Sequence, residues 1–399
     1  MPNTLPLEGI RVLEFTHAVL GPSTGMYLAD FGAEVIKVEP APHGDPTRRL
    51  KGFGMGFSPY TNRNKKSIAV NLKTEEGKEV VHRLLETAVV VIENFGPGTM
   101  ERLGFGYDDL KDRYPGLIYC TLKGFMPGPY EKRMALDEVV QMMSGLAYMT
   151  GRPGDPLRAG ASVVDIMTGM NGVIGILLAL REREQTGQGE LVKSTLFETA
   201  VFLMGQHMAY SAMSGKSVPP MPARVSAWGI YHQFDVAGGE RVFIGVTSDK
   251  QWERFCTVFE RADWFDDERI ATNNGRVEQQ PWLLPAIQEM VQPLAKEDVL
   301  ARCEQANLPF SPISRPEDMF TDRQLNEGGS LVETMLPNGT QTKLPKVPIR
   351  LGDDSFDIRS DPVGIGEQTI ELLAELGYST KEIQQLEMEE VVRSATEEL

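Results

Sequence analysis

Asp165 is the residue whose type and setting most clearly favour chemistry. It lies in Gly160–Gly175, where small residues precede a single carboxylate and an apolar segment follows. Apolar residues recur at helical spacing as far as Leu178, and Thr186-Gly187 marks the expected end of the helix. Free N–H groups and the positive end of the helix dipole favour an ionised carboxylate at such a start. Two roles fit this setting: a nucleophilic anion, or an ordinary helix cap.

Three glycines follow Asp165 in the same predicted helix, at positions 169, 172 and 175. Because glycine has no Cβ, another backbone or a ligand can approach a helix closely at such positions. We therefore expect either another backbone or a ligand to lie close against this helix.

A basic region between Lys37 and Lys66 is a second candidate site. It contains seven Lys and Arg residues but only Glu39 and Asp45 as acids, in a chain of net charge −16. One interpretation is a site for the phosphorylated end of a small molecule, with Arg48 and Lys66 as contacts. The other is a solvated, ion-paired loop. The acidic balance of the whole chain disfavours nucleic acid and anionic membranes as partners.

Two short motifs near the N-terminus carry less weight. Gly21–Gly25 matches the G-x-S-x-G pattern of serine hydrolases, but Ser23 lies several residues beyond the preceding strand rather than at a sharp elbow. Glu39 ends the second predicted strand, as the ribose-binding acid of a dinucleotide fold does, but the preceding loop lacks G-x-G-x-x-G. Neither a serine hydrolase nor NAD binding is favoured.

Short apolar runs alternate with helical patterns across the first half of the chain. The predicted strands are Gly9–Phe15, Ala33–Glu39, Ser67–Leu72, Ala88–Glu93, Leu117–Leu122 and Leu191–Leu196. Helices are expected at Ser23–Phe31, Thr74–Thr87, Leu136–Tyr148, from Asp165, and at Phe197–Ser214. A strand, a helix and a strand within about thirty residues form a parallel βαβ unit. The predicted fold class is therefore α/β, with a Rossmann-like large domain.

A proline-rich segment after residue 215 separates this pattern from a different one. A β-hairpin, a capping box at Ser248 and further helical stretches then indicate a small α+β domain. The predicted divisions are a large domain over 1–199, a linker over 200–223, a small domain over 224–325, a linker over 326–340 and a C-terminal part over 341–399.

Composition also bears on compartment and cofactors. Cys120, Cys256 and Cys303 are odd in number and lack metal or redox spacing, so we expect reduced thiols and no metal site. The first twelve residues lack the basic start and apolar core of a signal peptide, and we expect no membrane-spanning run. These features predict a cytoplasmic protein.

Several segments together resemble the class III CoA-transferases, which include formyl-CoA transferase and carnitine CoA-transferase. They are Leu7–Phe15 with Gly21-Pro22, Phe31–Glu39, Asn62–Ile68, Glu93–Gly98 with Arg102–Gly104, Val164-Asp165 and Arg183–Gly189. The resemblance covers nearly the whole chain. It implies a large domain made from both chain ends, a small domain between them, and two subunits interlocked as rings.

The resemblance also implies a reaction and its residues. The family's nucleophilic aspartate falls on Asp165, which favours the nucleophile over the helix cap. Family contacts to CoA fall on Ala18, Val19, Val70, Lys73, Asn94, Phe95, Gly96 and Arg102, with Asp137 in the acyl pocket. CoA would move from an acyl-CoA, with succinyl-CoA as the expected donor, to a carboxylic acid through an aspartyl anhydride and an aspartyl-CoA thioester. No permanently bound cofactor is implied, and the partner subunit is a second copy or a related chain.

Departures from the family pattern bear on the substrate. Pro40 and Met134 stand where formyl-CoA transferase has an arginine and a lysine, and its tetraglycine loop has no counterpart in Ala223–Gly239. The formyl and oxalate pairing is therefore disfavoured. The same fold hosts α-methylacyl-CoA racemases, but their histidine aligns with Leu136, which cannot exchange a proton. A racemase-like enzyme and a CoA-binding protein without turnover are the alternatives.

Overall fold

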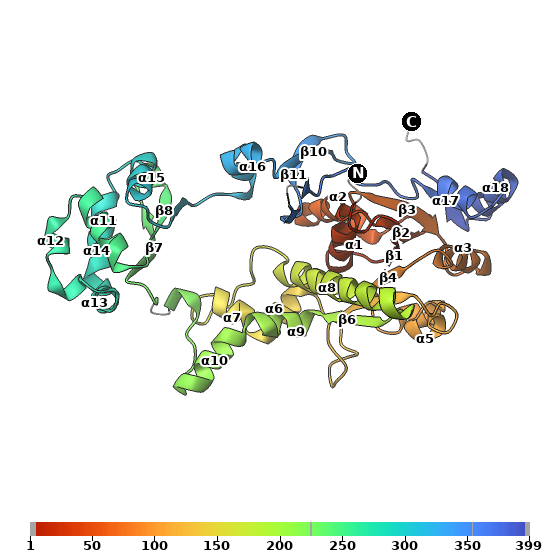
Figure 1. The fold of residues 1–399 in the computed structure, drawn as a ribbon, viewed down its shortest axis with the longest axis horizontal. Helices are drawn as coiled ribbons and strands as arrows, with labels where there is room; N and C mark the ends of the chain where they lie inside the picture. Colours follow the sequence, from red (N-terminus) through yellow and green to blue (C-terminus); the bar gives the residue numbers. More distant parts are fainter. Residues whose placement is uncertain (1–4, 224–225, 353, 396–399) are drawn as a thin grey trace. The chain divides into compact units, whose positions relative to one another are not determined.

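The structure, a computed structural model, describes residues 5–223, 226–352 and 354–395. Its contacts divide the chain into two compact units. The first unit contains Met1–Pro222 and Glu327–Leu399, and the second contains Ala223–Asn326. Figure 1 shows the elements of both units along the chain.

A seven-stranded sheet forms the centre of the first unit. Its strands are β1 (Arg11–Phe15), β2 (Glu34–Pro40), β3 (Lys65–Val70), β4 (Val90–Glu93), β5 (Ile118–Lys123), β6 (Leu191–Thr195) and β14 (Val392–Arg393). They lie in the order β14-β3-β2-β1-β4-β5-β6. The strands β1 to β6 pair in parallel, and β14 runs antiparallel to β3. The α/β fold class is confirmed, and each of the six parallel strands overlaps its predicted range.

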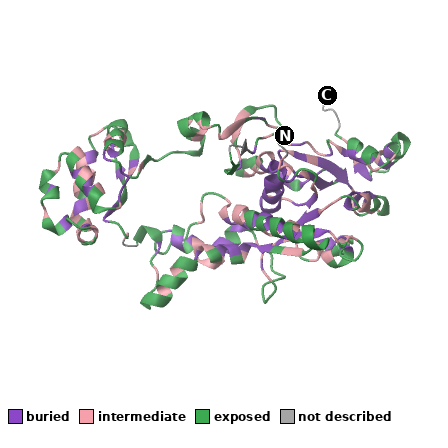
Figure 2. Ribbon diagram, viewed as in Figure 1, coloured by how far each residue is buried: buried purple, intermediate pink, exposed green. Residues whose placement is uncertain are grey.

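Helices cover both faces of this sheet. They are α1 (Leu20–Asp30), α2 (Phe57–Thr61), α3 (Glu75–Leu85), α4 (Thr99–Leu103), α5 (Tyr107–Leu110), α6 (Asp137–Ser144), α7 (Leu146–Thr150), α8 (Val163–Thr186), α9 (Leu196–Leu203), α10 (Gly205–Ser214), α17 (Thr369–Glu375) and α18 (Thr380–Met388). One apolar core joins α1 and α8 to the sheet, and another joins α3, α17 and α18 to its other face. The strands β1 to β5 are accordingly mostly buried (Figure 2), whereas the edge strand β6 is partly exposed.

The glycines of α8 allow the close packing that the sequence predicts. A Cβ added at Gly169 would lie 2.7 Å from Ser23 Oγ and 3.1 Å from the carbonyl oxygen of Leu20, both in α1. A Cβ at Gly172 would lie 3.0 Å from a methyl group of Leu122 in β5. The helix that begins beside Asp165 is therefore held directly against α1 and the sheet.

The structure corrects several predicted boundaries. The segment 200–223, predicted as a linker, contains the end of α9 and all of α10, because the apolar helical pattern continues past residue 199. The predicted linker 326–340 contains β10 (Leu331–Met335), which pairs with β11 (Gln341–Pro345). That pairing supplies hydrogen bonds that the local sequence does not reveal. The predicted helix Leu136–Tyr148 is divided by Gly145, whose φ of 90° ends α6.

The expectation of no membrane-spanning run also needs correction. By length and composition alone α8 is apolar enough to cross a bilayer, with a mean hydropathy of 1.9 over its most apolar window. The core helix of a soluble protein passes the same test, and the packing of α8 on α1 and β5 explains its apolar character.

The second unit has its own apolar core. Its strands are β7 (Ile230–Asp235), β8 (Arg241–Val246) and β9 (Phe310–Pro312), and its helices are α11 (Asp249–Val258), α12 (Ala262–Phe265), α13 (Asn273–Glu278), α14 (Gln280–Val291) and α15 (Lys296–Gln305), with α16 (Arg323–Glu327) at the boundary. The predicted hairpin is present as β7 and β8, and the Ser248 side chain caps α11 by accepting a hydrogen bond from the Gln251 N–H.

We expect Gly169→Ala to lower the free energy of unfolding. Alanine favours a helix interior by up to about 1 kcal/mol, but the added methyl group would force α8 away from α1, and such overpacking typically costs about 1–3 kcal/mol. Urea denaturation measures the net loss. Gly205→Ala in α10 is the matched control, because a Cβ there meets no atom within 4 Å and should not destabilise the protein. Equal stability of the two variants would contradict the close packing described here.

Candidate active site

Two loops meet where the strand order of the sheet changes direction, between β1 and β4. In open parallel sheets this point, at the carboxyl ends of the strands, is where ligands bind. The Asn94 side chain accepts a hydrogen bond from the His17 N–H at 2.9 Å and donates one to the His17 carbonyl at 3.0 Å. The Phe95 ring stacks on the His17 ring, with centroids 5.7 Å apart. These contacts fix the loop after β1 and the loop after β4 against each other.

Ala18 continues this loop in an unusual backbone conformation. Its φ is 61°, in the left-handed region that residues other than glycine rarely adopt. The Ala18 N–H donates a hydrogen bond to Thr47 Oγ1 at 2.8 Å, from the 3-10 turn η1 (Pro46–Arg49). Val19 follows as the buried N-terminal cap residue of α1. The predicted residues Ala18 and Val19 therefore lie at the switch point of the sheet.

Asp165 lies in the first turn of α8 and lines a cavity of about 110 Å³ at this same point. The other lining residues are His17, Ala18, Leu20, Asn94, Phe95, Gly96, Pro97, Leu122, Lys123, Gly124, Arg133, Met134, Ala135, Leu136 and Leu196. The structure thus brings five predicted residues together around one cavity: Ala18, Asn94, Phe95, Gly96 and Asp165. Asp165 is the only carboxylate among these lining residues.

The electrostatic state of Asp165 differs from the sequence-based expectation. Burial, and then the negative charge of Asp137, raise the pKa of Asp165 to about 7, and the Arg158 guanidinium opposes this rise. The predicted stabilisation of the anion by the helix start is therefore wrong. The reason is that another carboxylate takes the helix N–H groups: Asp137 Oδ2 accepts hydrogen bonds from the N–H of Val164 at 2.9 Å and of Asp165 at 3.1 Å.

Asp137 therefore has a different position from the one that the resemblance implies. It is buried at the start of α6, and it is not among the residues that line the cavity. Its carboxylate caps α8, and its neighbour Leu136 faces the cavity in its place.

The family model described as CoA-transferase family III matches residues 7–369. The chain belongs to CoA-transferase family III. It is 36% identical over 392 residues to a succinate–glutarate CoA-transferase of Agrobacterium fabrum, a match that covers 94% of this chain and 97% of that protein. It is 33% identical over 413 residues to a formyl-CoA:oxalate CoA-transferase of Streptomyces avermitilis, a match that covers 98% of this chain and 100% of that protein. The predicted family and a CoA-transferase activity are thereby confirmed.

The fold agrees with that of a solved family member. The crystal structure of a CAIB/BAIF family protein from Brucella suis matches with a TM-score of 0.83 and 33% sequence identity, covering 94% of this chain and 100% of that one. The large parallel sheet is thus consistent with this CoA-transferase family.

Three further predicted CoA contacts, Arg102, Val70 and Lys73, are not among the residues that line the cavity. Arg102 is an exposed residue of α4 whose guanidinium donates to Thr99 Oγ1 at 2.8 Å, and it forms no ion pair within the described part of the chain. Val70 is buried at the carboxyl end of β3, and Lys73 is exposed in the turn that follows. They occupy the same edge of the sheet as Asn94, since parallel strands end on one side.

The basic region does not form an open cluster of cations. Arg48 pairs with Glu39 at 2.6 Å, and Lys66 pairs with Glu34 at 2.9 Å and Glu371 at 2.8 Å. Lys66 also lies near the amino end of β3, at the edge opposite Asn94. The structure therefore brings neither Arg48 nor Lys66 to the Asp165 cavity.

Three more cations of this region are buried and paired within the protein. Lys65 pairs with Glu14 at 2.7 Å, Lys37 pairs with Asp45 at 3.1 Å, and Arg63 pairs with Asp30 at 2.7 Å. Burial lowers the pKa of Lys65 to about 8. Lys37 also donates a hydrogen bond to the carbonyl of Thr16 at 2.8 Å, next to His17. Lys37 therefore supports the loop after β1 from inside the protein.

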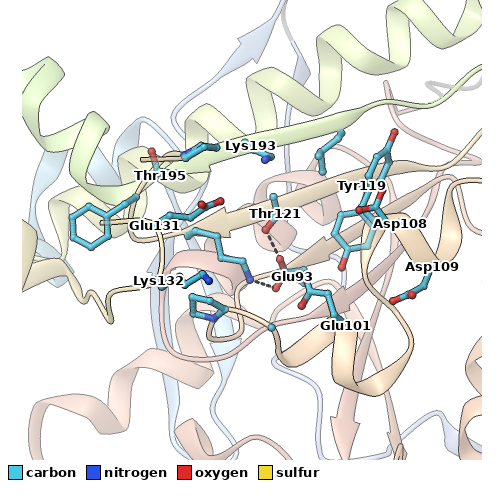
Figure 3. A pocket seen from close by; sticks show the side chains of 17 residues that line it. Glu93, Glu101, Asp108, Asp109, Tyr119, Thr121, Glu131, Lys132, Lys193 and Thr195 are labelled. Carbon is cyan, nitrogen blue, oxygen red and sulfur yellow. Dashed lines mark hydrogen bonds and ion pairs between the residues drawn. The ribbon is translucent and has the colours of Figure 1, made fainter. Parts of the chain in front are cut away.

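A second, larger cavity of about 370 Å³ shares Pro97 and Lys123 with the first. Figure 3 shows Glu93 and Thr121 within it, joined by a hydrogen bond. Lys123 donates hydrogen bonds to Glu93 Oε2 and to the Phe95 carbonyl, both at 2.6 Å, and Glu93 accepts another from the Phe95 N–H at 3.1 Å. Glu93 thus bonds the N–H of Phe95, and Lys123 bonds its carbonyl oxygen. Burial raises the pKa of Glu93, and Lys123 opposes the rise.

Sequence reasoning did not single out His17, Glu93 or Lys123 as site residues. Their common signal is a polar side chain at or just after the carboxyl end of an apolar parallel strand, where ligand contacts usually lie. No group of three or more His, Cys, Asp or Glu suited to a metal ion occurs within residues 5–223, 226–352 and 354–395.

We expect Asp165→Asn to stabilise the fold at high pH. Since the folded protein raises the pKa of this acid to about 7, ionisation opposes folding above the ordinary value. The full shift corresponds to about 4 kcal/mol, and partial exposure of the side chain reduces this to roughly 1–3 kcal/mol. The gain should be largest above pH 7, shrink as the pH falls, and vanish below about pH 4. Urea unfolding at several pH values measures it.

Asp112→Asn, at an exposed position, controls for the removal of one negative surface charge. A stability difference for Asp165→Asn that does not change with pH would contradict a raised pKa for this carboxyl group.

Proposed function

We propose that this CoA-transferase uses Asp165 as a covalent nucleophile that exchanges CoA between two carboxylic acids. One observation carries the proposal: Asp165 is the only carboxylate among the residues that line the cavity at the switch point of the sheet. The lining also contains Leu122, Met134, Leu136 and Leu196, whose apolar side chains help to exclude water from an acyl intermediate.

The proposed reaction has four acyl transfers. A carboxylate oxygen of Asp165 attacks the thioester carbonyl of the donor, the C–S bond breaks, and CoA leaves as a thiolate with a mixed anhydride left on Asp165. The thiolate then attacks the aspartyl carbon and releases the donor acid as a carboxylate. The acceptor carboxylate attacks this aspartyl-CoA thioester, the C–S bond breaks, and CoA leaves again as a thiolate from a second mixed anhydride. The thiolate finally attacks the acceptor carbonyl of that anhydride, which gives the acceptor's CoA thioester and releases Asp165 as a carboxylate. Each step exchanges one activated acyl group for another, so ATP is not required.

For the substrates, we propose an acyl-CoA donor with succinyl-CoA as the leading candidate and a small carboxylic acid as acceptor. The name of the Agrobacterium relative points to dicarboxylates of this size. Arg133 lines the cavity and supplies positive charge there, which suits an acyl group that carries a second carboxylate. We propose no permanently bound cofactor.

CoA itself is proposed to contact the residues at the carboxyl edge of the sheet. Ala18, Asn94, Phe95 and Gly96 line the cavity beside Asp165, and the Arg102 guanidinium is available to a phosphate group. We leave Arg48 and Lys66 out of this set because their charges are paired within the fold. Val19, Val70 and Lys73 stay as flanking contacts.

We further propose that two chains associate, as a homodimer or with a related subunit, through apolar faces of the first unit. Ile174 and Leu178 of α8, Phe202 of α9 and Met213 of α10 are between 55% and 90% exposed. Exposed apolar side chains on neighbouring helices are typical of a surface that packs against a second chain. Sedimentation equilibrium at micromolar concentration should therefore give twice the mass of one chain. A single species with the mass of one chain would contradict the dimer.

A cytoplasmic location is also proposed, since Cys120, Cys256 and Cys303 are all buried and unpaired. Recovery of the protein in a periplasmic or membrane fraction would contradict it.

The decisive experiment traps the acylated aspartate. Enzyme incubated with succinyl-CoA and then hydroxylamine should carry a hydroxamate on Asp165, located by peptide mass spectrometry, while enzyme without the thioester should not. Asp165→Asn removes the nucleophile with little change in shape, and it should lose transfer activity by roughly 10³-fold or more. A racemase-like enzyme or a protein that only binds CoA would form no hydroxamate. Substantial transfer by Asp165→Asn would contradict the proposal.

The same trapping reaction tests the CoA contacts. Arg102→Ala should need about ten times more acyl-CoA to reach half-maximal trapping and should recover full trapping at saturation. Lys66→Ala, the matched control, removes a cation from the opposite edge of the sheet and should leave this concentration unchanged. Equal effects of the two variants would contradict the assignment of Arg102.

A further inference from the structure

We propose that Asp137 is a positioning residue of the transfer reaction: by capping α8 with its own carboxylate, it sets the basicity of the nucleophile Asp165. The inference rests on the proposed role of Asp165 as nucleophile. It assigns to Asp137 a function that requires no contact with either substrate.

Asp137 is a helix cap whose two carboxylate oxygens both accept hydrogen bonds. Its Oδ2 accepts the N–H groups of Val164 and Asp165 at 2.9 and 3.1 Å, so the first donors of α8 point at Asp137. Its Oδ1 accepts a hydrogen bond from Gln141 Nε2 at 2.5 Å. The Gln141 amide oxygen in turn accepts one from the Ala159 N–H at 2.9 Å. These bonds tie α6, the segment before α8 and the start of α8 into one rigid unit.

The cap also determines which carboxylate benefits from the helix start. A helix N-terminus stabilises an anion through its free N–H groups and its dipole. Here Asp137 receives those bonds, whereas the Asp165 side chain accepts no hydrogen bond from the described residues. Two carboxylates therefore lie at one helix terminus, and the one that accepts the helix N–H groups is not the one that lines the cavity. Like charges so close disfavour ionisation of the other.

Other charged groups face Asp165 from the surrounding elements. The guanidinium of Arg158, from the segment before α8, lies 3.7 Å from Asp137 Oδ1. It also lies 3.6 Å from Glu138 Oε2, so it interacts with both carboxylates. His17, Lys123 and Arg133 line the cavity from the loop after β1, from β5 and from the loop before α6. The charge of Lys123 is balanced by Glu93 at 2.6 Å, and burial lowers the pKa of His17. Despite these cations, the pKa of Asp165 is raised to about 7 by burial and by Asp137.

A raised pKa suits the proposed chemistry. An ordinary aspartate has a pKa near 3.9 and a thiol a pKa near 8.5. Because the carboxylate is much less basic than the thiolate, the equilibrium of acyl transfer between them strongly favours the thioester over the anhydride. Nucleophilic reactivity rises with basicity, and a carboxylate of intermediate basicity lies closer to the thiolate with which it exchanges the acyl group. Asp137 would thus make the forward and return transfers at Asp165 more nearly balanced.

The test compares how the rate of Asp165 acylation depends on pH in the wild type and in two near-isosteric variants. In the wild type, the single-turnover rate of Asp165 acylation by succinyl-CoA should rise with pH, with a midpoint near 7. Asp137→Asn keeps an oxygen that can accept the α8 N–H groups but removes the charge. It should move the midpoint down by at least one pH unit and lower the plateau rate about three- to tenfold. Asp112→Asn, the control that removes an exposed negative charge with no ion pair to Arg158, should leave the midpoint within 0.2 units of the wild type.

Arg158→Gln should shift the pH midpoint of acylation in the opposite direction to Asp137→Asn. The reason is that it removes the cation that opposes the effect of Asp137 on Asp165. It should move the midpoint upward, and it decides the question if Asp137→Asn does not fold. The ¹³C resonance of the Asp165 carboxyl, assigned by its absence in Asp165→Asn, should show the same shifts without turnover.

The proposal is overturned if the midpoint and the ¹³C titration stay unchanged in folded Asp137→Asn, or in Arg158→Gln when the former does not fold. This outcome is distinct from a failure of the proposed function. If Asp165 is not the nucleophile, wild-type enzyme yields no hydroxamate at Asp165 at any pH. If only the role of Asp137 is wrong, the hydroxamate forms and its pH dependence is the same in both proteins.

Discussion

The close approach of α8 to α1 and β5 is the constraint on which the site depends. It requires glycine at positions 169 and 172, where side chains of the neighbouring elements occupy the space that a Cβ would take. Because α8 is held there, its first turn lies beside the loops that follow β1 and β4. A helix is a stiff element, so packing several residues along its length determines where a carboxylate at its start can point. The position of Asp165 thus follows from glycines that carry no functional group.

The loops that surround Asp165 are held by a second set of interactions, and these are polar. Asn94 bonds both backbone groups of His17, and the Glu93–Lys123 pair bonds both backbone groups of Phe95. Buried polar groups of this kind impose a single arrangement, because any other arrangement would leave hydrogen-bonding groups unpaired in a region that water reaches poorly. Apolar packing therefore places the helix, and buried polar bonding places the loops.

The sequence predicted the elements better than the partnerships among charged residues. The parallel strands are predictable because runs such as Ala88–Glu93 are apolar and bounded by turns, and the glycines of α8 indicated close packing. The resemblance supplied Asp165 as the proposed nucleophile and four further residues that line the cavity with it: Ala18, Asn94, Phe95 and Gly96. By contrast, the pairing of Lys66 with Glu371 joins residues 305 positions apart, and nothing in the local pattern of either segment indicates it. The exchange of roles between Asp137 and Asp165 at one helix start was equally hidden, because it depends on which carboxylate packs nearer to the N–H groups.

The antiparallel strand β14, which lies beside β3, has a consequence for the synthesis of the protein. Its residues, Val392 and Arg393, are synthesised more than three hundred residues after β3. Until then the outer edge of β3 has unpaired backbone groups, a surface prone to pair with other chains. The second unit, Ala223–Asn326, has a core of its own and can form in the meantime. The first unit must wait for a contact between its distant ends, which makes its closure slow and leaves the nascent chain dependent on protection from aggregation.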